Sequence, residues 1–131
     1  MSETPIKTQK QALRSEVRAL LQNLTTEQRT TGSAAICRAI TELVRASPAV
    51  HTIASFVALP SEPDLSALHI DLPNHRIVYP RSLAGGEMHF HQVSDLNQME
   101  PGFYAIPQPL DTPDTLIAPS EIDLFLCPGF A

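Results

Sequence analysis

The sequence has neither an excess of positive charge nor a long apolar run. Its formal net charge is −5, which argues against nucleic acid or an anionic membrane surface as a partner. The longest apolar run, Ile53–Leu59, is far too short to span a bilayer. The N-terminal segment MSETPIKTQK lacks the apolar core of a signal peptide. We therefore expect a cytoplasmic protein with no nucleic-acid partner and no membrane partner.

Cysteine is also scarce, and the two thiols, Cys37 and Cys127, fall in a predicted helix and a predicted strand. Buried free thiols are therefore favoured over a disulfide, which a reducing compartment would not maintain. Hydrophobic residues make up 43% and charged residues 18% of the chain, as in ordinary globular proteins. We predict that residues 1–131 form a single domain.

Residues 6–23 are predicted to form an amphipathic helix. Its apolar positions follow helical spacing: Leu13, Val17, Leu20, Leu21 and Leu24. Lys10 projects into this apolar sector and Arg14 lies at its edge. Lys10 therefore either extends its charged end to water or meets an anion bound near the domain, and the residues alone favour the first.

A capping box, Thr25 with Gln28, predicts that a second helix begins there and ends at Ser47-Pro48. Its predicted buried face consists of Ile36, Cys37, Ile40, Leu43 and Val44.

Four apolar or alternating segments are predicted to be strands. They are Thr52–Leu59, Arg76–Tyr79, Glu87–Val93 and Ile122–Cys127. The first and last are nearly continuous apolar runs, which is typical of strands buried on both faces of a parallel sheet. A brief helix is expected at Asp64–His69. We predict an α/β fold, a three-layer α/β/α arrangement with a mostly parallel, incomplete sheet.

Glu62 follows the first predicted strand in a turn at its carboxyl end. Ligands of open α/β sheets bind at such ends, so Glu62 could accept hydrogen bonds from ligand N–H groups. A carboxylate near a helix start is equally consistent with this position. The sequence leaves both interpretations open.

The segment EMHFHQV at 87–93 alternates as a strand should. Met88 and Phe90 share one face and are expected in the core, or in a pocket wall. His89 and His91 share the other face, which we expect to be exposed. A metal site would need a third ligand at a recognisable spacing, so we assign no metal site.

Residues 99–119 contain several prolines and are expected to be irregular. Within them, Phe103 and Tyr104 precede a stiff Pro-x-Pro, which would hold an aromatic ring rigidly against a ligand. An aromatic side chain packed within a loop is the commoner case.

These segments, in this order, resemble the 5-formyltetrahydrofolate cyclo-ligase family. The matching stretches are KQALR at 10–14, ASFVALPSEPD at 54–64, IVYPR at 77–81, EMHFHQV at 87–93, YAIPQP at 104–109 and IDLFLCPGF at 122–130. The resemblance implies an enzyme that uses ATP and Mg²⁺ to convert 5-formyltetrahydrofolate into 5,10-methenyltetrahydrofolate, ADP and phosphate. Phosphorylation of the formyl oxygen would make the formyl carbon a good electrophile.

The resemblance also implies roles for particular residues. Lys10 and Arg14 correspond to a nucleotide-binding pair. This role supplies an anion for Lys10, so phosphate binding is favoured over extension of its charged end to water. Five residues correspond to positions that bind or line the folate: Val57, Glu62, Met88, Phe90 and Tyr104. No catalytic residue is assigned.

The chain departs from the family pattern in three places. The segment from Leu65 to Arg76 is shorter than in the family. Pro63 stiffens the turn after Glu62. The family pattern also continues past Pro128 with Arg-Leu-Gly, Gly-rich and Tyr-Tyr-Asp segments that bind phosphates and metal, and these lie outside the 131 residues. We therefore expect the chain to be the N-terminal part of a cyclo-ligase-like domain, with little or no activity alone. Self-association through an exposed sheet edge is also expected.

Two other functions are possible on the sequence. The first is a folate-binding remnant without catalysis. The second is an α/β domain that binds a sugar phosphate or acyl-CoA, an idea that rests on fold-level analogy.

Overall fold

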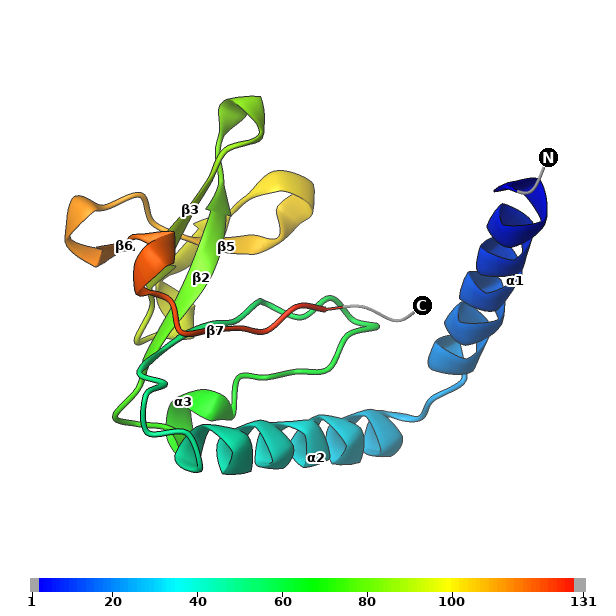
Figure 1. The fold of residues 1–131 in the computed structure, drawn as a ribbon, viewed down its shortest axis with the longest axis horizontal. Coiled ribbons are helices and arrows are strands. Elements are labelled where there is room, and N and C mark those ends of the chain that lie inside the picture. The colour runs from blue at the N-terminus through cyan, green and yellow to red at the C-terminus, as the bar shows by residue number, and fades with distance from the viewer. Residues whose placement is uncertain (1–2, 129–131) are drawn as a thin grey trace.

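The computed structural model describes residues 3–128, and Figure 1 shows two long helices beside a twisted sheet. Helix α1 (Glu3–Gln22) and helix α2 (Thr26–Arg45) confirm both predicted helices. The predicted capping box is present: the Gln28 N–H donates to Thr25 Oγ1 (3.0 Å), and the Thr25 N–H donates to Gln28 Oε1 (2.9 Å). The two hydrogen bonds of the capping box therefore determine where α2 begins.

The apolar side of α1 is only partly covered by the described part of the chain. Leu13 is 52% exposed and Leu20 is 62% exposed, while Val17 and Leu21 are half-buried. The helix stands apart from the sheet in Figure 1.

Helix α2 packs on the sheet through a narrower stripe than predicted. Cys37, Thr41 and Val44 are buried at helical spacing, but Ile36 and Leu43 are exposed, which corrects their assignment to the core. These two residues are seven apart, so they share one side of the helix and point past the edge of the contact. Periodicity located the correct sector but overestimated its width.

The main sheet has five strands in the order β6-β3-β2-β1-β7. Their bounds are β1 Thr52–Ala54, β2 Arg76–Ser82, β3 Met88–Gln92, β6 Leu116–Ile117 and β7 Leu124–Phe125. Strand β1 runs parallel to both β2 and β7, whereas β3 runs antiparallel to β2 and to β6. The α/β class predicted from the sequence is confirmed, with a mixed sheet whose parallel half is centred on β1.

Strand β1 is shorter than the predicted Thr52–Leu59, and β2 is longer than the predicted Arg76–Tyr79. The N–H of Ser55 still donates to the Val78 carbonyl oxygen (2.9 Å), after which the chain leaves the sheet. Strand β2 continues through Pro80 because it pairs there with β3. Alternate residues point their backbone groups to opposite neighbours, so the nitrogen of Pro80 faces the side where β1 has ended, and its missing N–H costs no ladder bond.

Strand β7 lies at the edge of the sheet in the described residues, where it pairs with β1 only. Phe125 is 48% exposed and Cys127 is exposed, so the predicted Ile122–Cys127 strand is shorter and is not buried on both faces. Cys37, in contrast, is buried as predicted, and both thiols are free. An edge strand gains cover from one neighbour alone, which explains the exposure.

The two faces of the sheet carry separate clusters. One packs against α2 and the short helix α3 (Leu68–Asp71), which replaces the predicted Asp64–His69 helix. It contains Ile53, Leu68, Leu72, Ile77 and Tyr79 among others. The other face holds Ala54, Val78, Ile117 and Ile122 with Phe90 packed on them. Helices α2 and α3 thus cover the first face of the sheet, through residues that include Cys37, Val44 and Leu68.

Residues 99–119 are more regular than expected. Strands β4 (Met99–Pro101) and β5 (Pro107–Pro109) form a two-stranded antiparallel sheet. Short 3₁₀ helices occupy Ala84–Gly86, Leu96–Gln98, Phe103–Ala105, Pro113–Thr115 and Pro119–Glu121. Strands of three residues that contain proline carry almost no periodic signal, so sequence patterns missed them.

The face of β3 that carries His89 and His91 is not the exposed face that alternation suggested. His91 is 1% exposed and His89 is half-buried, whereas Met88 is 49% exposed. Asp111 and Thr115, from a remote part of the sequence, lie against His91 and cover it.

None of the helices in residues 3–128 combines the length and the apolar composition that a membrane-spanning helix needs.

Asp123 joins β7 to the start of β1. Its Oδ2 accepts hydrogen bonds from the N–H groups of His51 (2.9 Å) and Thr52 (3.0 Å), and these bonds lower the pKa of the Asp123 carboxyl. A carboxyl whose pKa is lower in the folded state stabilises the fold above its unfolded-state pKa of about 3.9, and loses that contribution as the pH falls through the folded-state value.

We predict that the urea midpoint of the protein falls as the pH is lowered below about 4, and that Asp123→Asn makes this fall shallower. Asparagine keeps an acceptor oxygen but cannot ionise. Urea titrations across this pH range measure the effect. The control is Asp114→Asn, an exposed residue of a 3₁₀ helix. Equal pH dependence of the wild type and Asp123→Asn would contradict the assignment.

Candidate functional site

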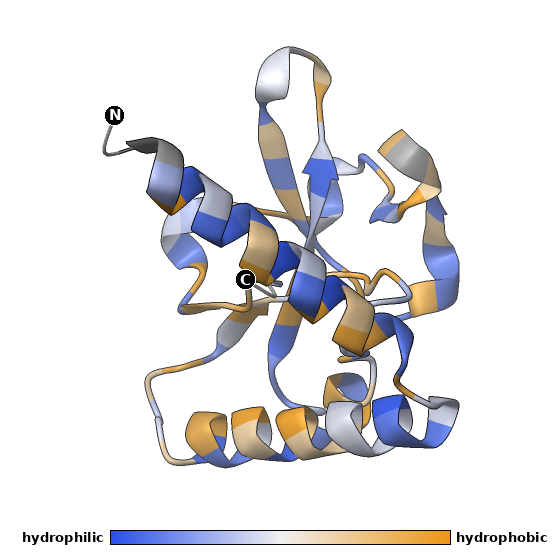
Figure 2. Ribbon diagram, turned by 90° about the vertical axis from the view of Figure 1, so that its right-hand side faces the viewer, coloured by the Kyte–Doolittle hydropathy of each residue, from blue (hydrophilic) through white to orange (hydrophobic). Residues whose placement is uncertain are grey.

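Cavities gather where β1 ends. Residues 55–64 leave the sheet beyond Ala54 and extend toward the side on which α1 stands in Figure 1, and α1 passes in front of the sheet in Figure 2. In open α/β sheets, ligands bind in the crevice outside the carboxyl ends of the parallel strands. The location matches that rule.

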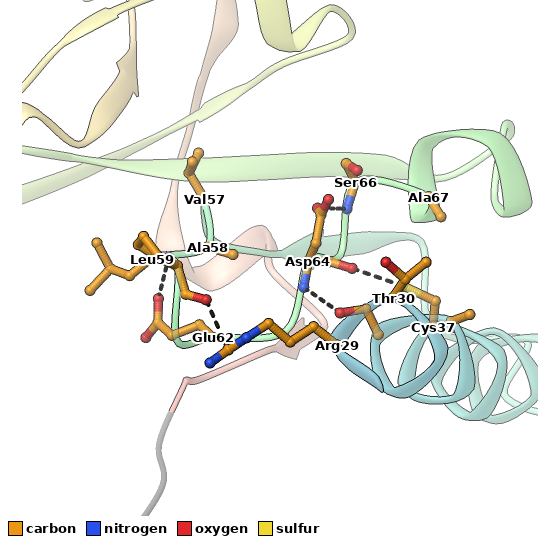
Figure 3. A pocket seen from close by; sticks show the side chains of 13 residues that line it. Arg29, Thr30, Cys37, Val57, Ala58, Leu59, Glu62, Asp64, Ser66 and Ala67 are labelled. Atoms are coloured by element: carbon orange, nitrogen blue, oxygen red, sulfur yellow. Dashed lines mark hydrogen bonds between the residues drawn. The ribbon is translucent and has the colours of Figure 1, made fainter. Parts of the chain in front are cut away.

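The first cavity lies between α2 and the 57–67 segment and has a volume of about 600 Å³. Figure 3 shows its lining, in which Arg29, Thr30 and Cys37 come from α2. The opposite wall is formed by the strand end and the turn, including Val57 and Glu62. A mixed polar and apolar wall of this size suits a small-molecule ligand.

Asp64 fastens this turn to α2. Its N–H donates to Ser33 Oγ (2.9 Å), and the Cys37 thiol contacts its carbonyl oxygen (3.6 Å). The Asp64 carboxylate accepts the N–H of Ser66 (2.9 Å), which closes the next turn. Burial raises the pKa of the Cys37 thiol, so this cysteine is a neutral packing group rather than a nucleophile.

Arg29 connects three segments, and sequence patterns did not single it out. One guanidinium nitrogen donates to the Pro60 carbonyl oxygen (3.0 Å), and the other donates to the carbonyl oxygen of Leu21 near the end of α1. A further cavity of about 510 Å³ lies here, between α1 and the 60–61 turn, and Arg18 also lines it. Two arginines therefore border the space between α1 and the turn.

The second cavity of the strand end has a volume of about 410 Å³ and joins two turns that are distant in sequence. Val57, Leu59 and Glu62 line it from the first turn, and Phe103, Ile106 and Pro107 line it from the 103–108 loop. The Glu62 turn and the 103–108 loop therefore border one cavity. The side chain of Tyr104 lies outside the described residues.

Glu62 lines both strand-end cavities and is half-buried. Its Oε1 accepts the Leu59 N–H (2.8 Å), and its own N–H donates to the Leu59 carbonyl oxygen (2.9 Å). The carboxylate therefore closes its turn and faces a cavity at once. A carboxylate carries acceptor sites for several hydrogen bonds, so one bond to Leu59 leaves capacity for a ligand.

The 102–106 loop is shaped by two backbone features. A Cβ at Gly102 would lie 2.9 Å from the Ile106 carbonyl oxygen and 2.5 Å from Gln108 Oε1, so only glycine fits without a shift. Ala105 has a φ of 60°, in the left-handed region that costs a non-glycine residue about 1 kcal/mol. Strain of this kind is typical of loops whose shape is needed for function.

The remaining predicted site residues lie elsewhere. Lys10 and Arg14 are exposed on α1, and neither lines the two strand-end cavities. Phe90 packs edge-on against Phe125, with ring centroids 5.8 Å apart, on the opposite face of the sheet. Met88 is at the exposed start of β3. The structure therefore brings together Val57, Glu62 and the Tyr104 loop but not these four residues.

Tyr79 is a residue of the second cavity that the sequence did not indicate. It is 2% exposed, its hydroxyl lies 2.7 Å from His69 Nε2, and its ring stacks on that of His69. Burial raises the pKa of Tyr79 to about 12, so the hydroxyl stays protonated. Its place at the end of a predicted strand, just before Pro80, was the only available signal.

Two solved structures share this fold. The first, a 5,10-methenyltetrahydrofolate synthetase from Mycoplasma pneumoniae, has a TM-score of 0.66 and 21% sequence identity, and the match covers 91% of this chain and 63% of that one. The second, the 5,10-methenyltetrahydrofolate synthetase of Aquifex aeolicus, has a TM-score of 0.71 and 20% identity over 88% and 58%. This chain thus spans about three fifths of their lengths. No sequence among curated proteins matches it.

The model of one family matches nearly the whole sequence, over residues 6–131, and both similar structures carry the same architecture. The chain belongs to the 5-formyltetrahydrofolate cyclo-ligase family.

Proposed function

We propose that this chain contributes the folate-binding half of a site that converts 5-formyltetrahydrofolate into 5,10-methenyltetrahydrofolate with consumption of ATP. Family membership supports the reaction class. The observation that carries the proposal is the cavity of about 410 Å³ shared by the Glu62 turn and the 103–108 loop. Its volume lies in the range of small-molecule sites.

The pterin ring would occupy this cavity between apolar walls. Val57 and Phe103 border it from opposite turns, and Tyr104 lies in the same loop. The Glu62 carboxylate would accept N–H hydrogen bonds from the pterin, because a carboxylate beside a flat amide-like edge can accept two at once. In this arrangement the acid orients the ring and the aromatic loop covers it.

The nucleotide would approach from the side of α1. Lys10, Arg14 and Arg18 are spaced four residues apart, so they form one stripe along that helix. Arg18 lines the cavity of about 510 Å³ together with Arg29, and the stripe leads away from it. A row of cationic side chains suits a polyphosphate, because the negative charges of a polyphosphate are also arranged in a row.

The reaction would proceed in two displacements. The formyl oxygen takes the γ-phosphoryl group of ATP and releases ADP. N10 then attacks the formyl carbon, loses its proton, and inorganic phosphate leaves with the former formyl oxygen. Residues of this chain would hold the ring and the phosphates in place, which is the main catalytic contribution in phosphoryl transfer. Mg²⁺ would neutralise phosphate charge when bound, and we assign it no ligand here.

A cytoplasmic location is part of the proposal. It is supported by the exposed free thiol of Cys127, which would persist best in a reducing compartment.

We predict that Glu62→Gln weakens binding of 5-formyltetrahydrofolate by about ten-fold or more, because hydrogen bonds to a charged acceptor contribute about 1.5–3 kcal/mol. Glutamine keeps an oxygen that can accept the Leu59 N–H, so the turn is preserved. Isothermal titration calorimetry measures the affinity.

The matched control is Glu87→Gln, an exposed residue next to β3. Unchanged affinity in Glu62→Gln would refute the role of Glu62. Folate binding that is independent of nucleotide would favour a non-catalytic folate-binding protein instead. Binding of a sugar phosphate or acyl-CoA with no folate affinity would overturn the proposal.

We predict that Lys10→Ala and Arg14→Ala each weaken ATP binding by roughly five-fold and leave folate affinity unchanged, because exposed charge pairs contribute up to about 1 kcal/mol. The loss should shrink at high salt. Fluorescence titration with a labelled ATP analogue at two salt concentrations measures both effects. Arg38→Ala, an exposed cation on α2 outside this stripe, is the control, and equal losses in all three variants would remove the assignment.

We also propose that the open edge of β7 pairs with a second copy of the chain. The edge strand and the half-exposed ring of Phe125 support this, since an unpaired edge is a template for another strand. We predict a mass in sedimentation velocity that rises with concentration, and a monomer for Phe125→Lys. A wild type that stays monomeric at every concentration would contradict it.

A further inference from the structure

Three metal-ligating side chains converge on the covered face of β3. His89, His91 and Asp111 each offer one ligand atom, and these atoms all lie within 4.8 Å of one another. The two histidines are two residues apart on one strand, and Asp111 comes from the segment between β5 and β6. None of the three lines the two strand-end cavities, so the cluster is separate from the folate site proposed above.

His91 is held in an orientation that leaves one nitrogen unsatisfied. Its side chain is 1% exposed, and its Nδ1 lies 3.0 Å from Thr115 Oγ1. Within the described residues, the buried Nε2 has no hydrogen-bond partner, although it lies 3.5 Å from Asp111 Oδ1. A buried polar atom without a partner is rare and calls for an explanation.

The hydroxyl of Thr115 lies within hydrogen-bond distance of three groups: the Thr112 carbonyl oxygen (3.3 Å), Thr112 Oγ1 (2.8 Å) and His91 Nδ1 (3.0 Å). It can therefore accept from or donate to His91 Nδ1, according to the tautomer of the imidazole. In the tautomer that metal ligation through Nε2 requires, Nδ1–H donates to Thr115 Oγ1 and the Nε2 lone pair faces the Asp111 carboxylate. A cation between these two acceptors would then stabilise both.

His89 supplies a second unsatisfied nitrogen. Its Nδ1 is also buried and has no hydrogen-bond partner among the described residues. Ligand atoms around a tetrahedral zinc ion lie about 3.3 Å apart, given metal–ligand distances of about 2.0–2.1 Å. The 3.5 Å between His91 Nε2 and Asp111 Oδ1 is already close to this separation. A small rotation of the His89 and Asp111 side chains would complete the set.

We propose that His89, His91 and Asp111 form a binding site for a divalent transition metal ion, and that Zn²⁺ is the ion that fits it best. Two imidazoles and one carboxylate are a donor set for zinc and its first-row neighbours, whereas Mg²⁺ and Ca²⁺ prefer oxygen ligands alone. The side chain of Asp111 is 56% exposed, which gives the ion a path from solvent and leaves a position for water.

Arg81, opposite His89 on β2, is the nearby positive charge that opposes this site. Its guanidinium forms an ion pair with Glu100 and donates to the Pro109 carbonyl oxygen (2.9 Å), so the Glu100 carboxylate offsets its charge. The ligand set brings one carboxylate charge of its own. Metal binding would fasten the 110–115 segment onto β3, because Asp111 is the only one of the three ligands in that segment.

The test is calorimetric titration of the full chain, prepared without a histidine tag and stripped with chelator, with ZnCl₂. We expect one Zn²⁺ per chain, and a loss of about ten-fold or more in affinity for both Asp111→Asn and His89→Gln. Asp111 is largely exposed, so its substitution leaves the fold intact. Cobalt titration should give visible absorption bands in the wild type that are lost in both variants.

Asp114→Asn and His51→Gln are the matched controls, an exposed acid of the same segment and an exposed histidine elsewhere. Both should bind Zn²⁺ within about two-fold of the wild type, since neither supplies a ligand. A wild type without saturable Zn²⁺ binding would overturn the proposal, as would unchanged affinity in Asp111→Asn and His89→Gln. Loss of folate affinity without loss of Zn²⁺ binding would affect the proposed function alone.

Discussion

The parallel pairing of β1 with β2 and β7 is the contact on which the rest of the structure depends. Thr52, Ile53 and Ala54 are all buried, and backbone hydrogen bonds link this short strand to both neighbours. Because β1 ends after three residues, the chain that follows can leave the sheet and form the wall of the cavities. A longer strand would have filled the same space with backbone.

This arrangement couples the site to α2 through a few specific contacts. Ser33 and Cys37 hold the backbone of Asp64, and Arg29 holds the carbonyl group of Pro60. Arg29 also reaches the end of α1, so one side chain links both helices to the turn that carries Glu62. The position of Glu62 therefore depends on contacts with α2 as well as on its own turn.

Local signals predicted the helices well, because the capping box and the helical period act within a few residues. Widths of buried faces were less predictable: Ile36 and Leu43 are apolar, yet they lie beyond the contact that α2 makes. The burial of His91 depends on Asp111 and Thr115, which no alternation within β3 could indicate. Val57, Glu62 and the 103–108 loop line one cavity. The family resemblance alone pointed to Val57, whereas Glu62 and the loop also stood out by their positions after or beside predicted strands. Sequence reasoning missed Arg29 and Tyr79, whose roles come from tertiary contacts.

Pro80 has a consequence for the shape of the mouth of the second cavity, which it helps to line. Strand β1 pairs with β2 only as far as Val78, whereas β3 pairs with β2 as far as Ser82. Beyond Val78, the edge of β2 on the β1 side is therefore unpaired in the described residues, and an unpaired edge can bind another strand. Pro80 has no N–H to donate on that side, so an extended segment cannot form a regular hydrogen-bond ladder with it. This part of the sheet edge therefore stays open to the cavity instead of pairing with another strand.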